Sequence, residues 1–258
     1  MKAALLLAAF VPVQSFNLPN IFKPPALNLP KKIDNNAPKE SDLLETISFT
    51  GNGKNADLET QTRVLKMVRI LETTYPTSPT LLSNAEEAKI LDGDWYLQYT
   101  QPCELENVDD DDQWVPVSAS EGESRIETRQ FNAGGSVTAA GVTVDASGNI
   151  PKQSFDIEKS RVQNEIVTGI GQVTVAGTFR QSKAVPQRAV VAFDTAKIAL
   201  NVGPTVDLSF LFAIRKALKG TGEAGWVETT YCSEEMRIGR GNKGSLFILT
   251  RDRDAVKS

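Results

Sequence analysis

From Leu91 onward, apolar and polar residues alternate along most of the chain, which is the period of β-strands that bury one face. In the first such segment Trp95, Leu97 and Tyr99 occupy alternate positions and are predicted to share that face. Turn residues, such as the Ala-Gly-Gly sequence at 133–135, separate the segments. The expected strands are 94–101, 113–118, 124–131, 136–144, 161–168, 171–181, 186–200, 225–232, 235–240 and 245–250. Many short strands at this spacing predict a barrel or a sandwich.

Before these strands the pattern is helical. Apolar residues recur at steps of three and four from Asp57 to Tyr75, which predicts one amphipathic helix that ends before Pro76. A shorter helical stretch is predicted from Asp42, and a capping box of one or two turns from Ser83. We therefore expect helices within 41–90, a barrel within 91–252 and a tail at 253–258. One interruption of the strands, 206–218, predicts a short amphipathic helix or lid.

The last segments indicate how a barrel would close. A short strand with Arg237, a Gly-Asn-Lys-Gly turn and the apolar strand 245–250 are typical of a hairpin. In a closed barrel the first and last strands are neighbours, so Arg237 is predicted to lie across the indole of Trp95. Arg240 lies farther along the same strand and need not share that face.

The amino-terminal residues have the features of targeting segments. Residues 3–13 are almost wholly apolar and follow Lys2, which predicts a signal peptide of residues 1–15, too short to span a bilayer. Residues 16–40 are rich in proline and lysine and resemble a transit peptide. Together they resemble the two-part plastid address of algae whose plastid lies inside the endomembrane system. Simple secretion is the alternative.

Composition narrows the classes of function and of catalytic or metal site that are possible. The chain has 258 residues, 40% of them apolar, with a net charge of −4 and no histidine. Residues 1–40 carry a net charge of +3, so the remaining chain is acidic and nucleic-acid binding is not expected. Without histidine, Ser-His and Cys-His nucleophile pairs and His-containing metal sites are impossible. We expect no enzyme activity, no cofactor and no metal, and we interpret the run Asp109–Asp112 as a solvated loop.

Two long motifs support a family resemblance. The first is Leu91-Asp92-Gly93-x-Trp95-x-Leu97-x-Tyr99-Thr100. The second is Arg237-Ile238-x-Arg240-Gly241 followed by Gly244-Ser245-Leu246-Phe247. With these motifs, residues 41–252 resemble the plastid lipid-associated proteins, also called fibrillins or plastoglobulins. The chain departs from the family pattern at Tyr231-Cys232-Ser233, where the family usually has Tyr-Leu-Asp.

The resemblance implies a mainly β fold, a lipocalin-like antiparallel β-barrel with short amino-terminal α-helices. It also implies a plastid protein associated with plastoglobules or thylakoids. The expected function is to carry an apolar ligand, namely a prenylquinone, a carotenoid or a fatty acyl compound, inside the barrel. The alternative is a structural coat on a lipid-globule or thylakoid surface, without a specific internal ligand.

Candidate ligand-binding residues are the large side chains expected inside the barrel. They are Trp95, Leu97, Tyr99, Phe179, Phe193, Trp226 and Arg237. Alternation does not distinguish an open interior from a solid core. A tryptophan in the first strand of a barrel mostly fills its tapered end, so the core role without ligand contact is favoured for Trp95. Cys103 and Cys232 both lie near strand ends, so a redox-sensitive disulfide between them is a further hypothesis.

Overall fold

The computed structural model describes most of the helical segment and the barrel. The described residues are 38–102, 105–107, 114–116, 136–139, 142–145, 149–183, 185–219, 225–241 and 245–256. The predicted signal peptide, most of the basic segment, the strand 124–131, the Asp109–Asp112 run and Cys103 lie outside them. The proposed disulfide therefore stays a prediction. In this described part of the chain, no helix is long and apolar enough to cross a membrane.

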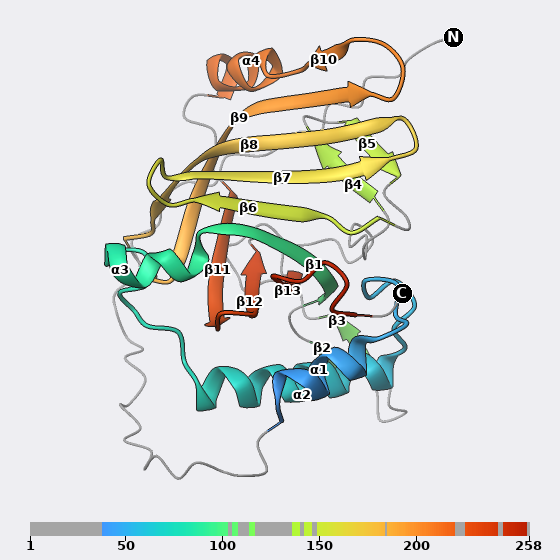
Figure 1. The fold of residues 1–258 in the computed structure, drawn as a ribbon, viewed down its shortest axis with the longest axis vertical. Coiled ribbons are helices and arrows are strands. Elements are labelled where there is room, and N and C mark those ends of the chain that lie inside the picture. Colours follow the sequence, from blue (N-terminus) through green and yellow to red (C-terminus); the bar gives the residue numbers. More distant parts are fainter. Residues whose placement is uncertain are drawn as a thin grey trace.

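Nine of the described strands form one antiparallel sheet that curves into a ring (Figure 1). They are β1 (Gly93–Pro102), β6 (Lys152–Asp156), β7 (Arg161–Thr168), β8 (Gly171–Gln181), β9 (Arg188–Leu200), β10 (Thr205–Asp207), β11 (Gly225–Cys232), β12 (Met236–Gly241) and β13 (Ser245–Thr250). The sheet order is β10-β9-β11-β12-β13-β1-β6-β7-β8, and β8 also pairs with β9. This last pairing closes the ring, so the predicted antiparallel barrel is confirmed.

Two strands, β1 and β9, pair with different neighbours along different parts of their length. Residues 93–96 of β1 pair with β6, whereas residues 96–102 pair with β13, which confirms that the first and last strands are neighbours. In β9, the first residues pair with β11 and the last pair with β10, while β8 follows almost its whole length. Short hairpins formed by β2 (Leu105–Asn107) with β3 (Trp114–Pro116), and β4 (Ser136–Ala139) with β5 (Val142–Asp145), pair separately.

The predicted helices are present, with shifted boundaries. The described ones are α1 (Glu40–Ile47), α2 (Leu58–Thr74), α3 (Ala85–Ala88), the 3₁₀ helix η1 (Lys89–Leu91) and α4 (Phe210–Lys219). Asp57 caps α2 by accepting a hydrogen bond from the Thr60 amide at 2.8 Å. The predicted cap at Ser83 is wrong, because Asn84 accepts from the amides that follow it. The hydroxyl of Ser83 instead donates to the Thr80 carbonyl.

Two further predictions need correction. The segment 206–218 does not begin as a helix, because residues 205–207 form β10 on the edge of β9 and α4 starts only at Phe210. The strand β6 was not expected, because its sequence Lys-Gln-Ser-Phe-Asp has Phe155 as its only large apolar residue. Its inward position opposite Trp95 is occupied by Gln153, so the alternation does not show in a hydrophobicity pattern.

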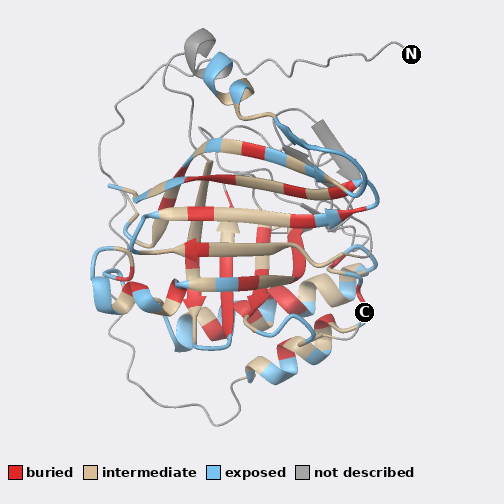
Figure 2. Ribbon diagram, turned by 45° about the horizontal axis from the view of Figure 1, so that its top comes forward, coloured by how far each residue is buried: buried red, intermediate tan, exposed pale blue. Residues whose placement is uncertain are grey.

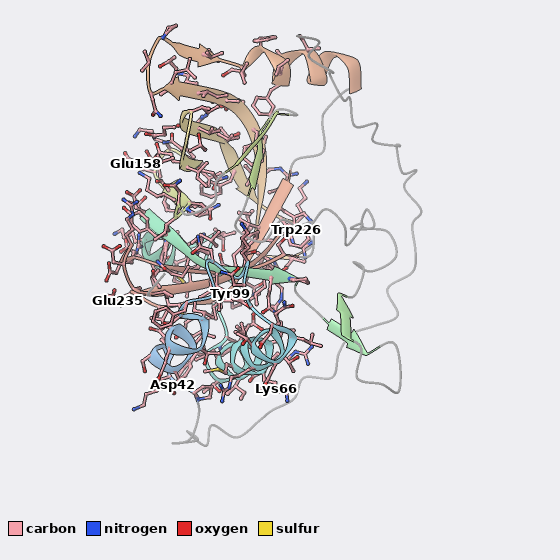
Figure 3. All side chains as sticks on the ribbon, turned by 90° about the vertical axis from the view of Figure 1, so that its right-hand side faces the viewer. Asp42, Lys66, Tyr99, Glu158, Trp226 and Glu235 are labelled. Carbon is pink, nitrogen blue, oxygen red and sulfur yellow. The ribbon has the colours of Figure 1, made fainter. Side chains whose placement is uncertain are left out.

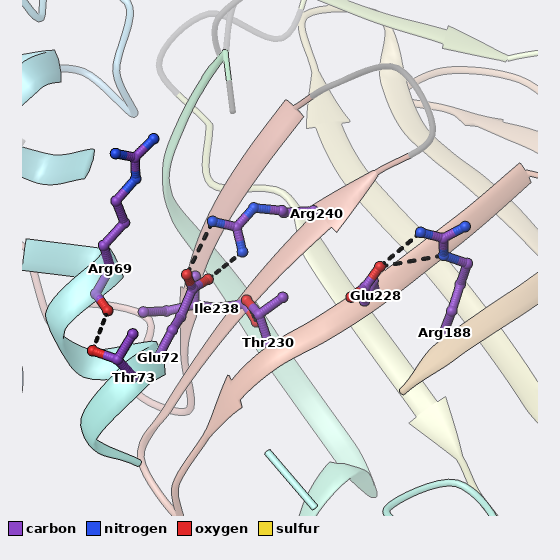
Figure 4. A network of polar contacts seen from close by, with 8 residues as sticks. All are labelled: Arg69, Glu72, Thr73, Arg188, Glu228, Thr230, Ile238 and Arg240. Atoms are coloured by element: carbon purple, nitrogen blue, oxygen red, sulfur yellow. Dashed lines mark hydrogen bonds and ion pairs between the residues drawn. The ribbon is translucent and has the colours of Figure 1, made fainter. Parts of the chain in front are cut away.

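The helices α1 and α2 cover one outer face of the barrel (Figure 2). Their apolar sides pack against residues of β1, β11, β12 and β13 in what we call the outer cluster. Its buried members are Leu43, Ile47, Val64, Leu65, Val68, Leu71, Tyr99, Tyr231, Met236, Ile238, Leu246 and Ile248. Arg240 of β12 forms an ion pair with Glu72 of α2, one of whose hydrogen bonds measures 3.0 Å, so α2 is also tied to the sheet by charge (Figure 4).

A single extra residue in β1 separates this face from the interior. Leu97 is paired with Leu249 and Tyr99 with Ile248, so Gln98 is an unpaired bulge residue. Because side chains alternate between faces, this bulge turns Tyr99 away from the face of Trp95 and Leu97. The predicted common face is therefore wrong for Tyr99, which belongs to the outer cluster.

Prediction on the packing of α2. Leu71 is fully enclosed, whereas its neighbour Ile70 is 42% exposed. We expect Leu71→Ala to lower the free energy of unfolding by about 2–5 kcal/mol, since it leaves a cavity against the sheet. The matched change Ile70→Ala should cost less than about 1 kcal/mol. Urea unfolding followed by circular dichroism measures both, and equal losses would contradict this account of the outer cluster.

Candidate functional site

The barrel interior is the site that the sequence prediction points to. Its buried apolar residues come from five strands of the ring and form what we call the inner cluster. They are Trp95, Phe155, Val162, Val191 and Leu249, with Leu97, Ile157, Phe179, Phe193, Val227, Cys232 and Phe247 partly buried against them. Four of the predicted residues, Trp95, Leu97, Phe179 and Phe193, lie in this cluster. Leu97, Phe179, Phe193 and Phe247 are each partly exposed. The described residues therefore do not fully close the inner cluster off from solvent.

Trp95 is held at the end of the barrel next to η1. Its indole nitrogen donates to the carbonyl of Leu91 at 2.9 Å, and the side chain is fully buried. The guanidinium carbon of Arg251 lies 3.8 Å from the ring centroid, and that of Arg237 lies 5.5 Å away. The predicted stacking of Arg237 on the indole is therefore confirmed. These contacts fix the position of the Trp95 ring, so we interpret it as a structural residue at this end of the interior.

Arg237 is the most unusual polar residue of the interior. It is 1% exposed, and its Nη2 donates to Oε1 of Gln153. Its guanidinium carbon also lies 4.8 Å from the ring centroid of Phe155. Its Nε and Nη1 have no hydrogen-bond acceptor among the described residues. Burial lowers the pKa of Arg237 to about 10, so the side chain remains a cation at neutral pH.

A short polar row surrounds this arginine. Gln153 donates to Oδ1 of Asn164 at 2.8 Å, and the two residues are paired across β6 and β7. Cys232 is paired with Arg237 across β11 and β12. Burial raises the pKa of the Cys232 thiol to about 11, so this thiol stays neutral and does not compensate the charge of Arg237. Leaving a buried cation with unused donors generally costs several kcal/mol of stability.

The sequence analysis missed Gln153 and Asn164. Both are polar residues in strands, so by hydropathy each suggests a solvent-facing position. The signal that identifies them is register, because Gln153 lies directly opposite Trp95 and Asn164 directly opposite Gln153. That register follows from the folded barrel and cannot be read from one strand alone.

Two predicted residues do not face the interior. Tyr99 lies between the sheet and the helices that carry Asp42 and Lys66 (Figure 3), and its hydroxyl donates to Gln101 at 2.7 Å. Burial raises the pKa of that hydroxyl well above its usual value. Trp226 is next to the inward-facing Val227 and therefore points outward.

Trp226 is half-buried, and its ring contacts a side chain on the outer side of the sheet. The guanidinium carbon of Arg188 lies 3.6 Å from its ring centroid, and Arg188 also forms an ion pair with Glu228 at 2.8 Å (Figure 4). The expectation that Trp226 lines the interior is thus wrong. Its position in β11 has the parity of the outer face, which also carries Glu228.

Helix α4 lies against the barrel and carries an exposed apolar side. The ring of Phe212 stacks on that of Phe193, with 6.5 Å between centroids. In contrast, Phe210 is 56% and Ile214 49% exposed. Other exposed apolar residues are Val167 near the end of β7, Ile170 in the β7–β8 turn, Val202 in the β9–β10 turn and Val206 in β10. A backbone hydrogen bond from Asn201 to Ile170 joins the two turns.

The interior combines apolar surface with a few polar groups. It offers aromatic and aliphatic surface together with one buried cation and two amide side chains. Within the described segments, no group of three or more acidic, cysteine or histidine residues could hold a metal ion.

Comparison with known proteins identifies relatives of this chain. Plastid lipid-associated protein 3, chloroplastic, of Brassica campestris is 25% identical over 231 residues, which cover 81% of this chain and 59% of that protein. Plastid lipid-associated protein 2, chloroplastic, of the same species is 28% identical over 234 residues, with 81% and 67% covered. Plastoglobulin-1, chloroplastic, of Pisum sativum is 25% identical over 230 residues, with 81% and 60% covered.

The chain thus spans 59% to 67% of the length of these curated relatives. No solved structure matches it. The sequence model of the PAP_fibrillin family matches residues 38–250, which include α1, α2 and every strand of the ring. The chain therefore belongs to the PAP_fibrillin family, as its terminal motifs predicted.

Proposed function

We propose that this protein binds a lipid of the plastid inside its barrel and carries or sequesters it. The observation that supports this most is the inner cluster, whose large inward-facing side chains remain partly exposed within a closed ring of strands. Burying a lipid chain against them would release water at about 25 cal/mol per Å² of apolar surface. Prenylquinones, carotenoids and fatty acyl compounds are the proposed ligand classes.

The names of the relatives support the location. They are described as chloroplastic, and as plastid lipid-associated proteins or plastoglobulins. We propose that this chain likewise acts in the plastid, at plastoglobules or thylakoids, and that residues 1–15 and 16–40 direct its import. We propose a non-enzymatic role, because a chain without histidine has few means of activating a nucleophile.

A structural coat is the second candidate, and a specific observation favours it. The apolar residues Val202, Val206, Phe210 and Ile214 are exposed in the segment that runs from the β9–β10 turn to α4. Such a surface suits insertion into the boundary of a lipid monolayer. Leu208 and Leu211 of the same segment are half-buried, so Phe210 and Ile214 are the residues that we propose to contact lipid.

Prediction for an internal ligand. Phe179 contacts Phe155 edge-on inside the barrel, with 5.5 Å between ring centroids. We expect at least one plastid lipid to bind saturably and to quench tryptophan fluorescence. Phe179→Ala should raise its Kd about tenfold, since apolar contact is lost. The control Phe49→Ala removes a ring that is 67% exposed on the helical side and should leave the Kd unchanged. No saturable binding across a panel of plastid lipids would rule out the carrier.

Prediction for a coat. If the exposed side of α4 anchors the protein, the double substitution Phe210→Glu and Ile214→Glu should abolish co-flotation with lipid droplets, because two buried charges oppose insertion. Phe179→Ala should float as the unchanged protein does. The pair Phe49→Glu and Ile70→Glu adds the same charge on the helical side and should also float. Loss of flotation in both charged pairs would show a general charge effect and contradict a coat formed by α4.

A further inference from the structure

Arg237 has more hydrogen-bonding capacity than the interior uses. A guanidinium has five N–H donors, one on Nε and two on each terminal nitrogen. Within the described residues, one acceptor is recorded for Arg237, the amide oxygen of Gln153, and none for Nε or Nη1. Three donors on a side chain that is 1% exposed are therefore unused. Buried donors in folded proteins nearly always have partners, so the unused donors of Arg237 require an explanation.

The described residues around Arg237 do not supply an opposite charge. Arg251, the second arginine on the Trp95 ring, is itself a cation and lowers the pKa of Arg237 further after burial. Both terminal nitrogens of Arg251 already donate, Nη2 to the carbonyl of Ile90 at 2.7 Å and Nη1 to that of Asp94 at 3.2 Å. Cys232 is a neutral thiol. The described interior is thus positive near Trp95 and has room in its hydrogen bonding for an anion.

Apolar rings lead away from this cation. Phe155 lies next to the guanidinium, and Phe179 contacts Phe155 in turn. Phe179 is paired with Val191 across β8 and β9, and Phe193 follows two positions along β9, where it meets Phe212 of α4. A positive group at one end of a continuous apolar row is the chemistry that suits an amphiphile with an anionic head and a long apolar chain.

We propose that the barrel binds a long-chain carboxylate, and that Arg237 is the residue that holds its head group. This inference rests on the proposed carrier function and names its ligand class. An ionised carboxylate accepts several hydrogen bonds and neutralises the buried cation. The ring carbonyl of a quinone would accept a hydrogen bond but leave the charge uncompensated, and a carotene hydrocarbon would do neither.

Stacking on aromatic rings is the competing explanation. The faces of Phe155 and Trp95 stabilise a cation, and Arg237 would then have a structural role only. The two explanations differ in one measurable respect. A purely structural arginine gives no preference between lipids that share a chain and differ in the charge of the head group.

The experiment compares three such ligands by calorimetry at pH 8, namely laurate, 1-dodecanol and methyl laurate, each below its aggregation limit. Laurate should bind the unchanged protein about tenfold or more tightly than the two neutral ligands, as expected for charge-assisted hydrogen bonds. Arg237→Gln should abolish that preference while changing the affinity for dodecanol less than about threefold. Arg237→Lys, which keeps the charge, should retain part of the preference.

A matched variant controls for the loss of an interior cation. Arg251→Gln removes the other arginine on the same indole, whose two terminal nitrogens already have carbonyl acceptors, and should keep the preference for laurate. A second measurement needs no variant: the carboxyl carbon of ¹³C-labelled laurate, bound to the unchanged protein, should titrate at a lower pKa than in solution because it faces a cation.

The outcomes separate this inference from the function on which it rests. Equal affinity for all three ligands, or a bound carboxyl whose pKa is not lowered, would overturn the role of Arg237 and leave the carrier intact. A preference for laurate that survives Arg237→Gln in a folded variant would also overturn it. If neither these three ligands nor any lipid of the plastid panel binds saturably, the carrier function itself fails.

Discussion

The unpaired residue in β1 determines how this molecule is divided into two cores. Gln98 has no partner in β13, so the residues before it face the ring and Tyr99 faces the helices. A second register shift in β11, between Thr229 and Tyr231, has the same effect, since Val227 lies in the inner cluster and Tyr231 in the outer one. With such shifts one strand supplies large side chains to both cores. The sheet therefore offers an apolar outer surface to α1 and α2 and still places apolar side chains inside the barrel.

Much of the barrel could be predicted because its signals are local. Period-two alternation in β8 and β9, the stripe of α2 and the turn residues between strands each depend on a few neighbouring residues. The contact between Trp95 and Arg237 was also predictable, since a closed barrel makes the first and last strands neighbours. The bulges were not, because one extra residue in an alternating segment leaves no mark until both partners are known.

The candidate site shows the same limit more sharply. Trp95, Leu97, Phe179 and Phe193 were found by their apolar character, while Gln153 and Asn164 were missed for lack of it. Strand β6 was missed for the same reason. A binding site must place a few polar groups where a core would be apolar, so hydropathy conceals the residues that distinguish an interior with a ligand from a solid core.

Helix α4 bears on whether carrier and coat exclude each other. On its barrel side Phe212 stacks on Phe193, a member of the inner cluster, and on its other side Phe210 and Ile214 are exposed. A lipid that leaves a monolayer must cross from an apolar surface to an apolar interior without full hydration of its chain, because each exposed CH₂ costs about 0.8 kcal/mol. An element that contacts both environments lowers that cost. The two proposed functions would then be compatible, with α4 resting on a lipid surface and the ligand entering the barrel beside Phe193.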